Sequence, residues 1–117
     1  MGTNFYLKPK NVDFKKAMEE DELVHIAKRS SGWRTCFQAH DEPGMLIRNV
    51  DHIRKYIEIG GYEVVSEYGD VLTPEQFEAD VVQWHGGGKG VPLSNKRDNF
   101  LVFHDTEGNE LTYTDFR

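Results

Sequence analysis

The densest mixture of groups that could do chemistry lies between residues 24 and 40, in the sequence VHIAKRSSGWRTCFQAH. It combines cations, hydroxyls and an indole ring, which attract anions, form hydrogen bonds and offer a face for stacking. We therefore predict that a ligand binds at Lys28–Trp33, which we call the cationic tip. The candidate ligand-binding residues are His25, Lys28, Arg29, Ser30, Ser31 and Trp33.

The elements that must position the cationic tip are those of a β-hairpin. Val24–Lys28 and Trp33–Ala39 are rich in β-branched and aromatic residues, and a polar, glycine-containing stretch connects them. His25 and Lys28 lie three residues apart, so a regular strand points them to opposite faces. Both can reach one pocket only if the strand bulges, which we place near Arg29.

The five histidines show no spacing typical of a metal site within one helix or strand, such as H-x-H or H-E-x-x-H. Three of them, each with an aspartate nearby, could still converge in the folded protein on a divalent metal or a phosphate. These residues are His25, His40 and His104, with Asp41 or Asp105. The chain has no Gly-x-Ser-x-Gly motif and no Cys/His nucleophile pair. We predict neither a metal nor a cofactor.

Cys36 is the single cysteine, which excludes an internal disulfide and a zinc site built from cysteines. Its place in an expected strand predicts a buried structural thiol rather than a nucleophile. No apolar run approaches the roughly 18 residues of a membrane span, and the N-terminus lacks the basic-then-apolar order of a secretion signal. We therefore expect a cytoplasmic protein that does not enter the membrane.

The charge is unevenly distributed along the chain. The formal net charge is −6, but residues 1–40 have a balance of +2 and residues 41–117 a balance of −8. Affinity for duplex nucleic acid comes mainly from Lys and Arg that neutralise phosphates, so we expect no such partner. An anion-binding surface belongs near the cationic tip, while the acidic remainder suits a basic protein surface.

The rest of the chain predicts two well-defined helices among short strands. The first, over Val50–Ile59, ends at a pair of glycines, and the second, over 74–85, begins with the capping box TPEQ. Strands are expected at 3–7, 24–28, 33–39, 100–103 and 110–113, with a shorter helix near 14–18 and a chain reversal at 41–44. Residues 62–72 could form a strand, a turn at Gly69-Asp70 and a short second strand. This order predicts one α+β domain over residues 1–117, with an antiparallel sheet of about five to six strands and two main helices packed on one face.

The glycine-rich stretch GGGKG at 86–90 invites comparison with a phosphate-binding loop. Such a loop follows a strand and leads into the N-terminus of a helix, whereas this one follows the end of an expected helix. We therefore expect a mobile loop that continues to Asn99.

Three blocks of the sequence, MGTNFYL, HIAKRSSGW and EYGDVLTPEQF, resemble a family of small uncharacterised phage and prophage proteins. Many members have a cysteine-rich, zinc-ribbon-like segment between the first two blocks. Residues 8–22 of this chain contain no cysteine, so a metal site does not follow from the resemblance. The matched residues are Asn4, His25, Lys28, Gly32, Trp33, Glu67, Tyr68 and Gly69.

The resemblance carries no established activity, so it favours a phage or prophage accessory protein that acts in the host cytosol. We expect a non-catalytic binding module that takes a host protein or a small anionic ligand at the cationic tip. If Lys28 and Arg29 are exposed, replacing both by glutamate leaves the fold nearly intact. The alternative is a small phosphoesterase, nuclease or nucleotide-modifying enzyme that uses the clustered histidines. A virion or assembly component is a third possibility.

Overall fold

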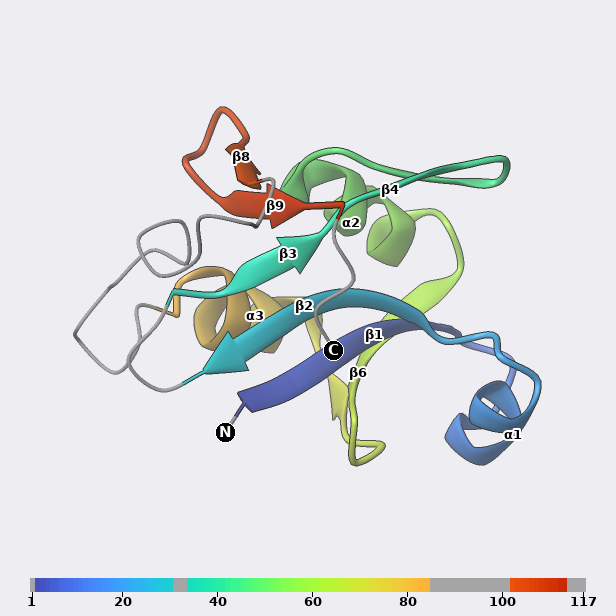
Figure 1. The fold of residues 1–117 in the computed structure, drawn as a ribbon. Coiled ribbons are helices and arrows are strands. Elements are labelled where there is room, and N and C mark those ends of the chain that lie inside the picture. The colour runs from blue at the N-terminus through green and yellow to red at the C-terminus, as the bar shows by residue number, and fades with distance from the viewer. Residues whose placement is uncertain (1, 31–33, 85–101, 114–117) are drawn as a thin grey trace.

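The computed structural model describes residues 2–30, 34–84 and 102–113, whose main feature is a seven-stranded sheet (Figure 1). The strand order is β7-β6-β1-β2-β3-β9-β8. The strands are β1 (Gly2–Pro9), β2 (Val24–Ser30), β3 (Cys36–Gln38), β6 (Tyr62–Ser66), β7 (Val71–Leu72), β8 (Val102–His104) and β9 (Glu110–Thr112). Described neighbours are antiparallel except β3 and β9, which run parallel.

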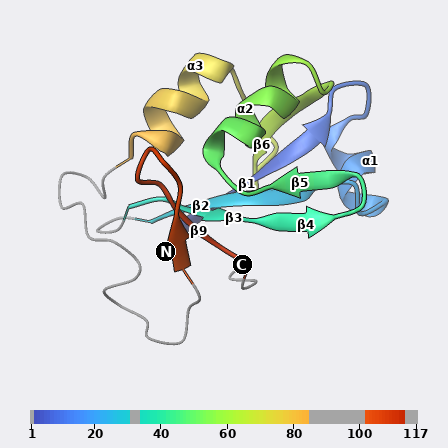
Figure 2. The same ribbon diagram turned by 90° about the horizontal axis from the view of Figure 1, so that it is seen from above.

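The two main helices cover one face of this sheet. Figure 2 shows α2 (Val50–Glu58) and α3 (Pro74–Phe77) on the same side of the strands. Ile53 and Ile57 of α2 and Phe77 of α3 belong to one buried cluster with apolar residues of the strands. A short helix, α1 (Phe14–Glu19), lies beyond the end of the sheet. The predicted α+β fold is thus confirmed, and the sheet exceeds five to six strands because even the two-residue β7 pairs with β6.

The predicted hairpin of β2 and β3 is present, with Ala27 opposite Phe37 and Lys28 opposite Cys36. On the other side of β2 lies β1, and the register between these two strands is irregular. Phe5 pairs with Ala27, but the next residue, Tyr6, pairs with His25. Ile26 is therefore an extra residue in β2, a β-bulge.

The bulge at Ile26 changes which face the later residues of β2 occupy. His25 lies opposite Tyr6 and Lys28 opposite Asn4, and these two partners stand two residues apart on β1. His25 and Lys28 consequently share a face, because alternate residues of a strand point the same way. The bulge that the sequence required for this lies between the two residues rather than near Arg29.

The helices begin where local capping groups predict. The Asn49 side chain accepts a hydrogen bond from the backbone N–H of His52 at 2.8 Å, and this caps α2. The predicted Thr73–Gln76 capping box is complete at the start of α3. The turn of α3 then widens into a π-helix, η1 (Glu78–Val82), which the sequence does not indicate.

Side chains of the sheet satisfy carbonyl groups in this π-helix. The guanidinium of Arg29 donates to the carbonyl of Asp80 at 2.9 Å, and the Thr35 hydroxyl donates to that of Val81 at 2.6 Å. Arg29 also lies over the rings of Phe5 and Trp84, 5.4 and 5.1 Å from their centroids. Both described cations of the tip, Lys28 and Arg29, are half-buried rather than fully exposed, and Arg29 also joins β2 to the helical layer.

The expected chain reversal at 41–44 belongs to a separate hairpin. β4 (His40–Glu42) and β5 (Met45–Ile47) pair with each other and turn through Gly44, whose φ of +89° suits glycine. The glycine-rich loop at 86–99 and tip residues 31–33 lie outside the described residues. Within the described part of the chain, no helix combines the length and apolar character needed to cross a membrane.

Candidate functional site

The face of the sheet opposite α2 and α3 carries an unusual number of polar side chains. The pairing places Lys28, Cys36 and Glu110 in one row across β2, β3 and β9, and Gln38 beside Thr112 in the next. Their neighbours in sequence, such as Phe37 and Leu111, point into the apolar core. We call this side of the sheet the polar face. His25, Gln38, Glu110 and Thr112 are all buried in it.

Residues from three distant parts of the sequence, MGTNFYL, HIAKRSSGW and EYGDVLTPEQF, meet around His25. The Asn4 side-chain oxygen lies 2.9 Å from Nε2 of His25, and the Glu67 carboxylate accepts from the backbone N–H of Asn4 at 2.7 Å. The Tyr6 ring packs near His25, with 5.4 Å between centroids. His25 is only 1% exposed, so this network supports the fold and does not present the imidazole to solvent.

The turn residues of the third block have the structural roles that their types suggest. Gly69 has a φ of +89°, and a Cβ at this position would lie 3.1 Å from the Phe14 ring. The neighbouring Tyr68 is exposed. Gly69 therefore serves both the turn after β6 and the contact of α1 with that turn.

The structure does not gather the cationic tip into one charged site. Lys28 lies on the polar face, whereas Arg29 reaches across the opposite face to Asp80. The side chain of Ser30, like Ser31 and Trp33, lies outside the described residues. Binding at the tip stays a prediction, and two of its described members, His25 and Arg29, already have partners within the fold.

The histidines converge only in part. Nε2 of His40 lies 2.7 Å from the carbonyl oxygen of His25, so this nitrogen donates. His104 lies elsewhere, with Nε2 3.2 Å from the buried carboxylate of Glu110. Among the described residues there is no group of three or more His, Cys, Asp or Glu side chains that could hold a metal ion.

The two other candidate reactive groups have structural roles. Burial, together with the nearby charge of Glu110, raises the pKa of the Cys36 thiol to about 12, so it stays protonated and inert as predicted. Partial burial favours the protonated form of Asp105, but hydrogen bonds from the backbone N–H groups of Val50 and Asn109 outweigh it and lower the pKa of this carboxyl. Asp105 thus joins the β8–β9 turn to the N-terminus of α2.

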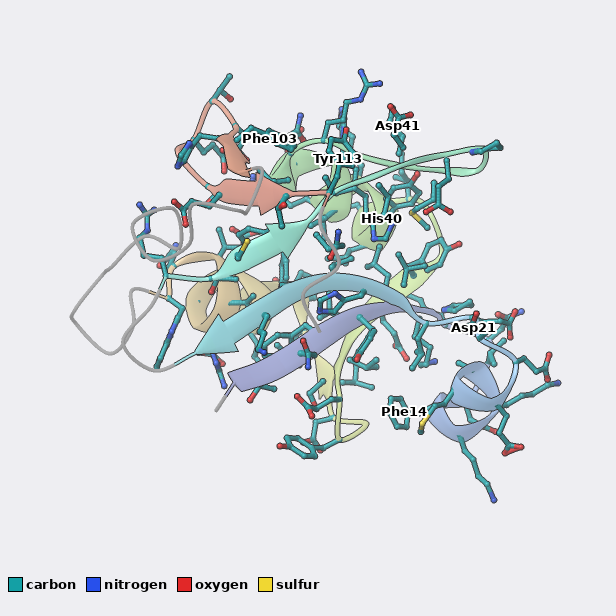
Figure 3. The ribbon with its side chains drawn as sticks, viewed as in Figure 1. Phe14, Asp21, His40, Asp41, Phe103 and Tyr113 are labelled. Carbon is teal, nitrogen blue, oxygen red and sulfur yellow. The ribbon has the colours of Figure 1, made fainter. Side chains whose placement is uncertain are left out.

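A hollow of about 370 Å³ opens on the surface where β3 passes into the β4–β5 hairpin. We call it the hairpin hollow, and it is lined by His25, Gln38, Ala39, His40, Asp41, Glu42 and Tyr113. Figure 3 shows His40, Asp41 and Tyr113 gathered at this junction. Residues of β2, β3, β4 and the end of β9 therefore form one depression.

The most informative side chain in the hairpin hollow is Gln38. It is only 5% exposed, and its Nε2 donates to the carbonyl oxygen of Thr112 at 3.1 Å. This contact fixes the amide, because the reversed orientation would bring two acceptor oxygens together. The side-chain oxygen Oε1 of Gln38 then remains buried, and no donor among the described residues reaches it.

The rim of the hairpin hollow is acidic. Asp41 forms an exposed ion pair with Arg48 at 2.8 Å, and hydrogen bonds to Asp41 and Tyr113 raise the pKa of this arginine. Glu42 is 68% exposed and lies 3.4 Å from Nδ1 of His40, with no Lys or Arg among the described residues paired to it. The rim thus offers two carboxylates, of which one already has a cationic partner.

Sequence reasoning missed Gln38, Glu42 and Tyr113 as site residues. One available sign was the position of Gln38 two residues after Cys36 and two before His40, which puts three polar or polarisable groups on one strand face. The missing donor for Gln38 depends on Thr112, a residue 74 positions away, and leaves no local trace in the sequence.

No family model, no curated protein and no solved structure matches the chain.

Proposed function

We propose that this protein is a non-catalytic binding module, as expected of a phage or prophage accessory protein, and that it captures its partner at the hairpin hollow. The observation that carries the proposal is the buried side-chain oxygen of Gln38, which has no donor within the part of the chain that the structure describes. A buried polar atom without its hydrogen bond destabilises a protein by about 1–3 kcal/mol. A ligand that supplies the donor recovers this energy, so the empty acceptor favours binding.

The surroundings of Gln38 suit binding better than catalysis. The hollow is at the small end of the size range of ligand pockets, roughly 300–1,000 Å³. Its two histidines, His25 and His40, already engage Asn4 and a backbone carbonyl. The Cys36 thiol is buried and its pKa is raised. No described nucleophile stands beside a base in the geometry that covalent catalysis requires.

The hairpin hollow also suits a partner better than the cationic tip does. Arg29, the best-placed cation of the tip, already donates to Asp80 and lies over two aromatic rings. The acceptor on Gln38 has no such engagement. An unsatisfied hydrogen-bond acceptor gains more binding free energy from a ligand than a group that must first give up an existing contact.

The test is an NMR titration of ¹⁵N-labelled protein with a panel of small probes: capped amino acids of acidic, basic, amide and aromatic type, and inorganic phosphate. We expect saturable shifts of the signals of Gln38, His40 and Tyr113 with at least one probe, which is recovered chemically unchanged. Q38M should abolish these shifts. The matched control, Q83M, alters an exposed glutamine outside the hollow and should not.

Two results would contradict the proposal. If no probe class shifts the NMR signals of the hairpin hollow, the hollow is not a binding site. Phosphate-induced shifts centred on Lys28, with the hollow unchanged, would instead return the function to the cationic tip.

A further inference from the structure

Two side chains of the hairpin hollow, Gln38 through Oε1 and Glu42 through its carboxylate, offer acceptors to a ligand. Oε1 of Gln38 is a carbonyl oxygen whose amide is held by the contact with Thr112. Nε2 of His40 donates to the carbonyl oxygen of His25 and is therefore already engaged. Nδ1 of the same ring lies 3.4 Å from the Glu42 carboxylate, so both ring nitrogens of His40 have partners within the fold.

The charge around these acceptors is negative. Among the described residues, the charged groups at the rim are Asp41, Glu42 and Arg48. Arg48 pairs with Asp41, whereas Glu42 has no described Lys or Arg partner and contacts only His40 Nδ1. An anionic ligand would meet this carboxylate and would offer no donor to Gln38. A ligand with several N–H donors and a positive charge complements both features.

One wall of the hollow is aromatic. Tyr113 is about half exposed and its ring stacks on that of Phe103, with 5.6 Å between centroids and 28° between planes. The face of an aromatic ring attracts cations, most often guanidinium groups. Guanidinium is planar and has five N–H donors, whereas ammonium is a compact point charge without a face to stack.

From these three features we propose that the hairpin hollow receives the guanidinium of an arginine side chain, with Gln38 Oε1 and Glu42 as its acceptors. The inference rests on the proposed function and names the ligand class of the same site. A hollow of about 370 Å³ suits one side chain better than a folded surface, so the arginine enters as a projecting group.

Two sources can supply this group, free arginine and an arginine within a protein segment. The acidic balance of residues 41–117 adds a long-range attraction for a basic segment that a single amino acid exploits less. Free arginine and the capped peptide Gly-Gly-Arg-Gly-Gly therefore form separate arms of the test.

The experiment compares Nα-acetyl-arginine amide with the citrulline analogue, which has nearly the same shape and keeps N–H donors but is uncharged. Dissociation constants are measured by NMR titration at fixed ionic strength. We expect arginine to bind at least tenfold more tightly than citrulline, and more tightly than the lysine analogue, because a charge-assisted hydrogen bond is about twice as strong as a neutral one.

Two variants assign the acceptors. E42Q removes the rim charge at an exposed position that cannot disturb folding, and it should weaken arginine about threefold or more while citrulline changes little. E19Q, the same change on the exposed face of α1, is the control. Q38M should weaken both probes about tenfold or more, because both need the same acceptor.

The results distinguish the guanidinium assignment from the proposal that the hairpin hollow binds a partner. If another probe saturates the hollow while arginine binds no better than citrulline, the guanidinium assignment is wrong and the binding module stands. If no probe reaches the hollow, both fall. If free arginine binds as tightly as the peptide, the ligand is a small molecule; tighter peptide binding, reduced by salt, indicates a basic protein segment.

Discussion

The two ends of the β2–β3 hairpin differ in what they leave available to a partner. The end towards the cationic tip is rich in charge, but its Arg29 is already bound to Asp80 and two aromatic rings. The other end has no conspicuous sequence, yet there Gln38 keeps a buried acceptor without a donor. The comparison teaches that charge in a sequence locates a possible site, whereas unmet hydrogen-bonding capacity in the fold locates an available one.

The largest difference in stability should appear when Arg29 and Lys28 are each replaced by glutamine in separate variants. R29Q loses the bond to the Asp80 carbonyl and the cation–π contacts, so the free energy of unfolding should fall by about 1.5–2 kcal/mol. K28Q should change it by no more than about 0.5 kcal/mol, because the half-buried Lys28 side chain has no hydrogen bond or ion pair with another described residue. Urea unfolding monitored by circular dichroism measures both.

Equal and small effects of these two substitutions on the free energy of unfolding would contradict the proposed difference between Arg29 and Lys28. Arg29 would then contribute no more to the fold than Lys28 does. The cationic tip would regain its place as the preferred site, with both cations free to meet an anion.

A smaller effect, dependent on pH, should arise at the turn between β8 and β9, which leads into the strand that ends at Thr112. The pKa of Asp105 is lowered in the fold, so its contribution to stability is present above the unfolded pKa of about 3.9 and is lost as pH falls through the lower folded value. D105N should be less stable than wild type at pH 7 by about 0.5–1 kcal/mol, typical of an anion at a helix N-terminus.

The difference between D105N and wild type should shrink as pH falls below about 4, because the wild-type carboxyl is then protonated too. Thermal unfolding between pH 2.5 and 7 tests this. A difference that stays constant with pH would mean that the charge of Asp105 contributes nothing. NMR signals of the hollow, but not those of Lys28, should respond to D105N.

The smallest stability change should come from Q38M, which tests whether Gln38 serves binding or the fold. The substitution loses the bond to Thr112, whose carbonyl still accepts from the Ala39 N–H at 2.8 Å, and it removes the unsatisfied oxygen. These changes oppose each other, so the free energy of unfolding should stay within about 0.5 kcal/mol of wild type. A loss above 2 kcal/mol would show that Gln38 is a structural residue.

Local chemistry was enough to predict much of the fold. Asn49 and the TPEQ box start the two helices because capping involves residues only three apart. The hairpin of β2 and β3, the reversal at Gly44 and the buried thiol of Cys36 likewise depend on residues that are close in sequence. The α+β class follows from the order of these elements.

Other features depend on partners that are distant in sequence. The π-helix after Phe77 has carbonyls that Arg29 and Thr35 satisfy from the sheet. The bulge at Ile26 appears only when β2 is aligned with β1, and it decides that His25 and Lys28 share a face. The parallel pairing of β3 with β9 joins residues more than 70 positions apart.

Residue types and short-range spacing account for the starts of the two main helices, for most strands of the seven-stranded sheet and for the distribution of charge along the chain. They do not account for the strands β4 and β5 or for η1. Which polar groups are hydrogen-bonded within the fold and which stay unsatisfied depends on the tertiary structure. Arg29 is engaged because η1 lies across from it, and the oxygen of Gln38 is unsatisfied because Thr112 takes its amide hydrogen. A hydrogen bond requires both partners at about 3 Å, and only the folded chain brings distant residues that close.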